Sequence, residues 1–449
     1  MNNKVLFVAY HFPPDAAVGA LRTQKFVKYL PKHGWQPFVL TVKEQFYPIC
    51  EPARLHDVKD AVVERTSFWR TPWQLLIDFR DNHIRKKTAI RMSSGNTVKQ
   101  TQNTTSRMSA IKRFLVGLNH FPDDYMFWLF PAFRKGIRLI QKNDIRLIVV
   151  STPPRSSIIL AYLLAVFTGA KLVVDFRDPW NLNYEGAEKS LKPDMQIAAE
   201  QIVQRRILKR TSAVLTTNDF FRSALLREHP FLKANSVHVI HNGFDLSDFP
   251  QVDKRTGTNK YVISYVVSYY MQHTPADFLN ALSIFMSEKG LSGSDLEMRF
   301  IGDIHGEWVD PVSKLIEDKG LEDVVRMTGR LPYAQSLALM MESSLLVITY
   351  HKRPYQIPAK MYEYMGAGAP ILALIDPGAA TALMDEMHAG IWVKPHDIDG
   401  MGRALHRLYD DYLNGDGVYA YDASVFERRN QSVQLAKILE KVSAPILPG

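Results

Sequence analysis

The feature that most constrains the fold is a repeated alternation of short apolar runs with helical stretches. "KVLFVAY", at residues 4–10, is followed by a loop that contains two prolines and Gly19. Apolar residues at helical spacing come next and end at Gly34, before the apolar run "QPFVLTV". A strand, a helix and a second strand in this order form a βαβ unit, which predicts a parallel sheet.

The alternation occurs in two series separated by a polar stretch. The first series continues through "IRLIVVST", "KLVVDF", "SAVLTTN" and "SVHVIHNGFD". The polar stretch "PQVDKRTGTNK", at residues 250–260, is typical of a linker. The second series contains "YVISYVV", "EMRFIGD", "VVRMTG", "LLVITY", "PILALI" and "GIWVKP". These runs are continuously apolar, as expected when helices cover both faces of a sheet.

The two series predict an α/β fold of two doubly wound, Rossmann-like domains. A chain of 449 residues exceeds what one core ordinarily holds. We place the domains at residues 1–249 and 261–420, with the linker at 250–260 and a final segment at 421–449. In open parallel sheets ligands bind beyond the carboxyl ends of the strands. Residues that directly follow strands are therefore the candidates for a site.

Composition and apolar segments bear on the compartment. Hydrophobic residues make up 46% and charged residues 22% of the chain, a balance typical of soluble proteins. The single cysteine, Cys50, excludes an internal disulfide and fits a reducing compartment. The first apolar run begins at Lys4, so we expect no secretory signal. "SSIILAYLLAVFTGA" is shorter than the roughly 18 residues a spanning helix needs, which favours a buried helix and a cytoplasmic protein.

A strongly basic segment, residues 80–113, interrupts the pattern in the first domain. It holds nine lysines and arginines against Asp81 alone, a balance of +8 in a chain whose net charge is +9. This insertion either contacts an anionic membrane surface, which would make the protein peripheral to the cell membrane, or forms a solvated loop. Nucleic acid is not favoured as a partner, because no binding motif accompanies the charge.

The stretch "YQIPAKMYEYMGAGAP", at residues 355–370, carries the clearest candidate chemistry. It follows the strand "LLVITY", and Pro358 suits the first turn of a helix. The positive end of that helix and Lys360 would attract a diphosphate, and Glu363, one turn on, could accept hydrogen bonds from a ribose diol. The alternative is a surface ion pair between Lys360 and Glu363.

The chain resembles the GT-B glycosyltransferases of the GT4 type, in particular bacterial surface-polysaccharide enzymes with "DFRDPW" and "K-x-x-E-Y" patterns. The motifs that carry the resemblance are "FVAYHFPPDAAVGALRTQKFVKYLPKHGWQPFVLT", "FPDDYMFWLFPA", "STPPRSS", "VVDFRDPW", "VIHNGFD" and "IPAKMYEYMGAGAPILAL". The resemblance implies two domains facing across a cleft, with the nucleotide sugar on the second and the acceptor on the first. It also implies that the final helix, within 421–449, crosses back to the first domain.

The resemblance assigns donor-binding roles. It implies that Glu363 binds the donor ribose and that Lys360 lies near the diphosphate. Gly19 matches a first-domain loop that closes over the diphosphate. "TGRLPY" is similar to a turn whose backbone contacts the nucleobase, and Arg330 within it is either part of that site or a solvated side chain.

"VVDFRDPW" supplies the candidate catalytic residues. It follows a strand, at the place where many relatives carry a histidine facing the donor sugar. Arg177 takes that place here, between Asp175 and Asp178. Three charges at the carboxyl end of a strand favour a place in the cleft. The alternative is an Asp–Arg–Asp pairing that shapes the loop.

Two positions depart from the family pattern. Tyr355 stands where many relatives carry a glutamate that faces the sugar. His273 matches an arginine that grips the diphosphate, and a histidine lacks both the permanent charge and the bidentate fork. Either arginines of the first domain, such as Arg22 or Arg177, compensate, or catalysis is weakened.

The resulting hypothesis is retaining sugar transfer from a nucleotide diphosphate sugar to a glycan or lipid-linked acceptor. We expect no cofactor and no metal, because zinc-ligand spacing is absent and "DID" at residues 397–399 is better explained as a helix cap. One alternative is a catalytically weak GT-B scaffold that binds a nucleotide or a partner enzyme. A sugar-nucleotide epimerase is a third, but it would need further acid and base residues.

Overall fold

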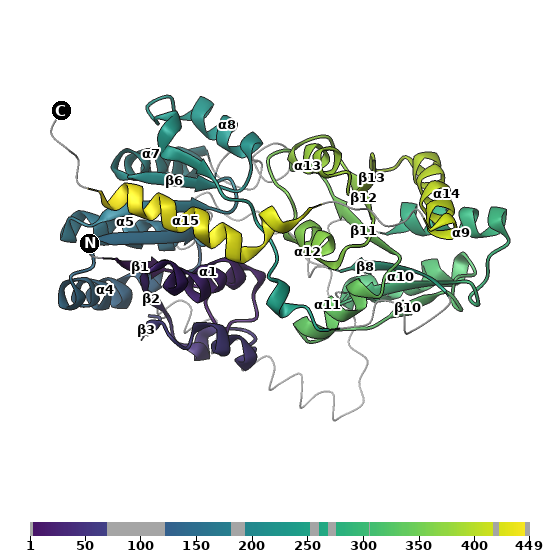
Figure 1. Cartoon of the computed structure of the whole chain (residues 1–449), viewed down its shortest axis with the longest axis horizontal. Coiled ribbons are helices and arrows are strands. Elements are labelled where there is room, and N and C mark those ends of the chain that lie inside the picture. The colour runs from purple at the N-terminus through teal and green to yellow at the C-terminus, as the bar shows by residue number, and fades with distance from the viewer. Residues whose placement is uncertain are drawn as a thin grey trace, which may run out of the picture. The chain divides into compact units, whose positions relative to one another are not determined.

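The chain forms two parallel α/β sheets with helices around them (Figure 1). The computed structural model describes residues 3–69, 122–180, 194–251, 260–267, 275–304, 306–415 and 422–444. The basic segment at 80–113, His273 and most of the expected linker at 250–260 lie outside the described residues.

The first sheet has seven strands in the order β3-β2-β1-β4-β5-β6-β7. The pairings from β3 through β6 are parallel, as the βαβ pattern predicts. The order reverses between β1 and β4, which is the switch point of a doubly wound sheet. The strands are β1 (Lys4–Val8), β2 (Gln36–Val42), β3 (Val62–Thr66), β4 (Leu147–Thr152), β5 (Lys171–Phe176), β6 (Ala213–Thr216) and β7 (Val237–Val239).

Helices connect these strands as expected for crossover connections. They are α1 (Val18–Tyr29), α4 (Leu129–Asn143), α5 (Arg155–Thr168), α7 (Asp194–Arg210) and α8 (Asp219–Glu228). The apolar stretch after Pro154 forms α5, and Gly169 ends it in a left-handed conformation with φ of 74°. Only one side of α5 is buried, because Val166 and Phe167 are exposed. Within the described part of the chain, no helix has the length and apolar content that crossing a membrane requires.

The second sheet has six strands in the order β10-β9-β8-β11-β12-β13, all paired in parallel. Its switch point lies between β8 and β11. The strands are β8 (Tyr261–Val266), β9 (Leu296–Ile301), β10 (Val325–Met327), β11 (Leu345–Tyr350), β12 (Ile371–Ile375) and β13 (Gly390–Val393). The helices are α9 (Ala276–Lys289), α10 (Gly306–Asp318), α11 (Tyr333–Met341), α12 (Ala359–Ala367), α13 (Ala379–Met387) and α14 (Ile398–Asn414).

The core of the second sheet lies on both of its faces. Successive residues of β11 enter different clusters: Val347 packs in the cluster that holds Phe285 of α9, and Ile348 in the one that holds Met361 of α12. Side chains alternate between the faces of a strand, so both faces of this sheet are covered. This confirms the interpretation of the continuous apolar runs.

Contacts divide the chain into two compact units. Unit 1 comprises residues 1–177, 184–215 and 436–449, and unit 2 comprises residues 178–183 and 216–435. The sequence places the first boundary at 249, whereas the contacts group 216–249 with unit 2, where Phe244 joins the core cluster of α12. The last helix, α15 (Arg428–Ser443), belongs to unit 2 up to Leu435 and to unit 1 from Ala436.

Candidate functional site

Helix α12 begins at the carboxyl side of β11, next to the switch point of the second sheet. Pro358 is its N-cap residue in an extended conformation, one position before the first turn in which the sequence places it. Lys360 is therefore the second residue of the helix, close to its free N–H groups and positive dipole end. Gly368 ends the helix with φ of 75°, so the glycine-rich stretch stops it as predicted.

Glu363 is a buried carboxylate with two fixed partners. Lys360 donates from Nζ to Glu363 Oε2 at 2.9 Å, and Tyr333 donates from its hydroxyl to Oε1 at 3.0 Å. The expected ion pair is present, but the glutamate is buried and so is not a surface residue. A carboxylate accepts about four hydrogen bonds. One acceptor position on each oxygen therefore remains for a ligand with two neighbouring hydroxyls.

Tyr333 is a site residue that the sequence reasoning did not single out. It is the first residue of α11 and the last of "TGRLPY", the turn proposed to contact a nucleobase. Burial, followed by the negative charges of Glu363 and Asp248, raises the pKa of Tyr333 well above its ordinary value. The hydroxyl therefore stays protonated and donates to Glu363. Arg330, in the same turn, is exposed.

Two glycines shape the backbone at the ends of neighbouring strands. Gly302, after β9, has φ of 116°, and an added Cβ would lie 2.9 Å from the carbonyl oxygen of Val267. Gly329, after β10, has φ of 65° and forms an isolated bridge with Gly302. Val267, whose carbonyl oxygen approaches Gly302, is buried. Close backbone approach at this edge therefore depends on these two glycines, which sequence reasoning also missed.

Hydrogen bonds hold Tyr355 and Gln356 in the loop between β11 and α12. This tyrosine is half-buried, and its carbonyl oxygen accepts from Asn218 Nδ2 at 2.9 Å. The neighbouring Gln356 is buried; its Oε1 accepts from the hydroxyl of Tyr350 at 3.0 Å, and its Nε2 donates to Asp178 Oδ1 at 2.6 Å. Asp178, although exposed, is thus held by a buried amide.

Asp175, at the end of β5 in unit 1, is a buried ion-pair partner. Arg22 donates to its two oxygens from Nε at 2.8 Å and from Nη2 at 2.9 Å, and Ser151 Oγ adds a third bond at 3.0 Å. Both charged side chains are at most 2% exposed. Arg22, which the sequence offered as a spare cation, is therefore engaged with Asp175.

Arg177 donates to several backbone carbonyls. It donates to the carbonyl oxygens of Gly19 and Pro153, and from Nε to that of Thr152 at 3.4 Å. Gly19 lies in the first turn of α1, where the sequence had placed a loop. A Cβ at this position would lie 2.8 Å from Arg177 Nη1, so the glycine leaves room for the guanidinium.

A second feature missed by sequence reasoning lies after β1. His11 Nδ1 is 2.6 Å from Asp15 Oδ2, and the aspartate is buried. Its other oxygen accepts from the backbone N–H of Ala17 at 3.0 Å. The fixed carboxylate can orient the imidazole at the carboxyl edge of the first sheet.

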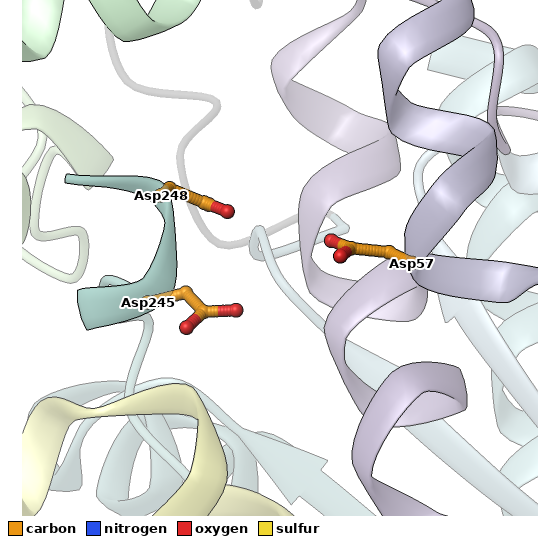
Figure 2. A group of neighbouring side chains, drawn as sticks. All are labelled: Asp57, Asp245 and Asp248. Atoms are coloured by element: carbon orange, nitrogen blue, oxygen red, sulfur yellow. The ribbon is translucent and has the colours of Figure 1, made fainter. Parts of the chain in front are cut away.

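The three aspartates in Figure 2 come from two units, and each unit is considered by itself. Asp57, in unit 1, points toward α1 and accepts from Lys25 Nζ at 2.6 Å. Burial acts to raise the pKa of Asp57, but the charge of Lys25 and nearby hydrogen bonds outweigh burial and lower it. In unit 2, Asp245 accepts from Ser247, and Asp248 comes from the same short 3-10 turn. We assign no metal ion to these carboxylates.

One cavity of unit 1 lies away from the carboxyl edge of its sheet. It has a volume of about 760 Å³ and lies where β4 and β5 begin, lined by Leu147, Phe167 and Lys171 among others. The candidate residues Asp175 and Arg177 lie at the opposite, carboxyl edge of the sheet. Ligands of such sheets bind at the carboxyl edge, so this cavity is not the candidate site.

Curated relatives match part of the chain. A mannosyltransferase of Mycolicibacterium hassiacum, described as MMP alpha-(1->4)-mannosyltransferase, is 21% identical over 54% of this chain and 57% of its own length. A D-inositol 3-phosphate glycosyltransferase of Paenarthrobacter aurescens is 29% identical over 39% of this chain and 42% of its own length. The chain thus spans about half the length of the curated relatives it matches.

Solved structures resemble the fold over nearly the whole chain. HepE from Anabaena, crystallised with UDP and glucose, has a TM-score of 0.63 at 14% identity and covers 98% of this chain and 99% of its own. Sucrose-phosphate synthase from Thermosynechococcus elongatus has a TM-score of 0.65 at 15% identity, with 98% and 99% covered. At such low identity these likenesses show the fold, which is GT-B.

Family models assign both halves of the chain. The model for glycosyltransferase family 4 matches residues 102–248, and the model for glycosyl transferases group 1 matches residues 250–417. The two matches adjoin at residue 249, and residues 250–260 lie within the second match. The chain therefore has the GT-B fold, and its two matched regions are similar to glycosyltransferase domains.

Proposed function

We propose that this protein is a retaining glycosyltransferase that moves a sugar from a nucleotide diphosphate sugar to a glycan or lipid-linked acceptor. The observation that carries the proposal is Glu363, a buried carboxylate beside the helix N-terminus, with one acceptor position left on each oxygen. We further propose a role in bacterial cell-surface polysaccharide synthesis, at the cytoplasmic face of the membrane. The two matched family models support glycosyl transfer as the class of reaction.

The donor fits the features of α12. The two hydroxyls of a ribose would bind to the two oxygens of Glu363, while Lys360 and the first N–H groups of the helix would face the diphosphate. The ion pair to Lys360 and the bond from Tyr333 would fix the carboxylate before the donor arrives. HepE, one of the similar structures, was crystallised with UDP-glucose, a ligand of the proposed class.

The proposed chemistry is a displacement on one face of the sugar. The bond between the anomeric carbon and the diphosphate oxygen breaks as the acceptor oxygen bonds to that carbon from the same side. The proton of the acceptor hydroxyl passes to the departing diphosphate. Lys360, the helix N-terminus and first-domain arginines would stabilise the negative charge without a metal. We propose Arg177 and Asp178 as the residues beside the donor sugar, with Asp175 supporting them.

A second candidate is a GT-B scaffold with weak or no turnover. Tyr355 supports it, because an aromatic side chain offers no carboxylate to the positive charge that develops at the anomeric carbon. His273 also supports the scaffold, because the resemblance places it where an arginine grips the diphosphate and a histidine lacks the permanent charge of an arginine. Both candidates bind a nucleotide, so only turnover separates them.

Calorimetry with UDP, GDP and ADP tests the donor site. We expect one nucleotide to bind and Glu363→Ala to weaken it by roughly one to two orders of magnitude, because two hydrogen bonds to a charged group are lost. Glu317→Ala, at an exposed position of α10, is the matched control and should bind as the wild type does.

Turnover is measured next, as hydrolysis of the sugar derivatives of the nucleotide that binds. Release of sugar at a rate above the Glu363→Ala variant supports the transferase, whereas binding without release supports the scaffold. If none of the nucleotides binds, both candidates are wrong.

A further inference from the structure

Helices α4, α5 and α7 form an outer surface of unit 1 with an unusual composition. Helix α5 contacts α4 on one side and α7 on the other (Figure 1). Between its polar end residues Arg155 and Thr168, the positions of α5 that are not buried recur at helical spacing and are aliphatic or aromatic: Ile159, Tyr162, Leu163, Val166 and Phe167. The solvent-facing side of such a crossover helix is ordinarily polar. This is the apolar stretch that the sequence marked and that the proposed sugar transfer does not use.

The apolar stripe of α5 is exposed at its end, where it contacts an aromatic side chain of α4. The side chain of Phe167 is 68% exposed and that of Val166 is 48% exposed. Phe167 meets Phe133 of α4 at 5.3 Å between ring centroids. On α7, Ile202 is 64% exposed. Exposed apolar side chains that gather on one face indicate an interaction surface.

Basic residues flank the stripe on both sides. Helices α4 and α5 contain no acidic residue, and α7 contains only Asp194 and Glu200. Glu200 is buried and accepts from Arg155 Nη1 at 3.0 Å, so its charge is neutralised. The exposed basic residues of α4 and α7 are Arg134, Lys135, Arg138, Lys142, Arg205, Arg206, Lys209 and Arg210. Of these, Lys135 is paired with Glu64 Oε1 at 2.9 Å.

We infer that this surface binds an anionic lipid membrane, with Val166 and Phe167 entering the interface and the flanking cations meeting lipid phosphates. An apolar stripe between basic rows has the pattern of an interfacial helix, and each nearby cation strengthens binding to anionic lipid. A second copy of the chain is a poor occupant, because two such faces would oppose like charges. The inference is independent of the sugar transfer, since it concerns binding without nucleotide or acceptor.

Flotation with phospholipid vesicles tests the inference on the full chain. Wild-type protein should float with vesicles of phosphatidylcholine mixed with phosphatidylglycerol, and much less with phosphatidylcholine alone. High salt should weaken the binding, because it screens the exposed charges. Equal binding to both vesicle types, or to neither, would overturn the inference.

Two variants separate the contributions of charge and apolar surface. Replacing Arg134, Arg138 and Lys142 by glutamine should reduce the vesicle partition coefficient by at least roughly tenfold. Val166→Ser with Phe167→Ser should reduce it by on the order of tenfold through loss of apolar burial. All five side chains are exposed, so the variants should unfold at the wild-type temperature.

Matched controls lie on α14 in unit 2. Leu413→Ser removes an apolar side chain that is 61% exposed, and Arg403→Gln with Arg407→Gln removes two exposed charges. Both controls should float as the wild type does. Wild-type flotation of the α4 and α5 variants would overturn the inference. So would loss of flotation confined to glutamine replacements in the basic segment: Lys86, Lys87, Lys112 and Arg113.

Discussion

At the scale of single residues, the surroundings of a charge decide what it can do. Glu363 and Asp175 are both buried carboxylates at carboxyl edges of parallel sheets. Glu363 keeps an acceptor position on each oxygen, whereas Asp175 accepts three bonds from Arg22 and Ser151. The first arrangement suits a ligand and the second suits a fixed structural pair. The sequence could name both residues but could not give their partners.

Asp175→Asn tests whether this aspartate has a structural or a catalytic role. The change removes the negative charge that faces the buried Arg22, and we expect the free energy of unfolding to fall by roughly 3–5 kcal/mol. Urea denaturation measures this loss. Asp410→Asn, in an exposed pair with Lys289, is the matched control and should cost less than about 1 kcal/mol. Unchanged stability with lost turnover would instead favour a direct catalytic role for Asp175.

Gly19→Ala tests the space that the glycine leaves for Arg177. The new Cβ would meet Nη1 at 2.8 Å, so the guanidinium must shift away from the Gly19 carbonyl. We expect turnover to fall by roughly tenfold if Arg177 serves the donor. Gly402→Ala, in α14 with nothing within 4 Å of the new Cβ, should leave turnover unchanged and stabilise the helix by about 0.5–1 kcal/mol. Equal turnover in both variants would argue against a role for Arg177.

At the scale of elements, the ends of helices carry the free N–H groups and the capping bonds on which the proposed site and local stability depend. The N-terminus of α12 points its free N–H groups to the carboxyl side of β11, and Gly368 closes the other end. Helix α14 has a side-chain cap, because Asp397 Oδ1 accepts from the N–H of Gly400 at 2.8 Å. The sequence interpretation of "DID" as a cap is thereby confirmed. Such caps could be predicted because their bonds join residues only three apart.

Asp397→Ala tests that cap. Loss of its bond to Gly400 leaves an N–H of the first turn without its partner, and we expect a cost of about 1 kcal/mol in unfolding free energy. Asp397→Asn keeps a capping oxygen and should restore most of the stability. Thermal and urea unfolding of the two variants give the comparison. If alanine and asparagine behaved alike, the side-chain bond would contribute little.

At the scale of the whole molecule, buried tyrosines link stability to alkaline pH. Burial raises the pKa of Tyr47 to about 12, although its bond with Thr41 acts in the opposite direction. Burial raises the pKa of Tyr10 and Tyr364 in the same direction. The folded protein therefore holds these protons at pH values where the unfolded chain releases them. The contribution of these tyrosines to the free energy of unfolding is fully present below pH 10 and is lost as the pH rises toward 12.

Urea unfolding between neutral pH and about pH 11 measures this loss. The free energy of unfolding should fall steadily above pH 10, the ordinary pKa of tyrosine. Tyr47→Phe should be less stable at neutral pH, because it loses the bonds to Thr41 and to the Tyr10 carbonyl, but it should lose less on going to alkaline pH. An equally steep loss in this variant would show that Tyr47 does not contribute.

The sequence by itself determined the two doubly wound domains, the end of α12 at its glycines and the placement of Lys360 and Glu363 on one helical face. These features depend on apolar periodicity, glycine conformation and spacing within one turn, all of which are local. Only the tertiary structure decided that Tyr333 bonds Glu363, that Arg22 engages Asp175 and that α5 leaves Val166 and Phe167 exposed. Those contacts join residues 30 or 153 positions apart, or depend on which faces neighbouring helices cover. Periodicity marks a face as apolar, but only packing decides whether that face is covered.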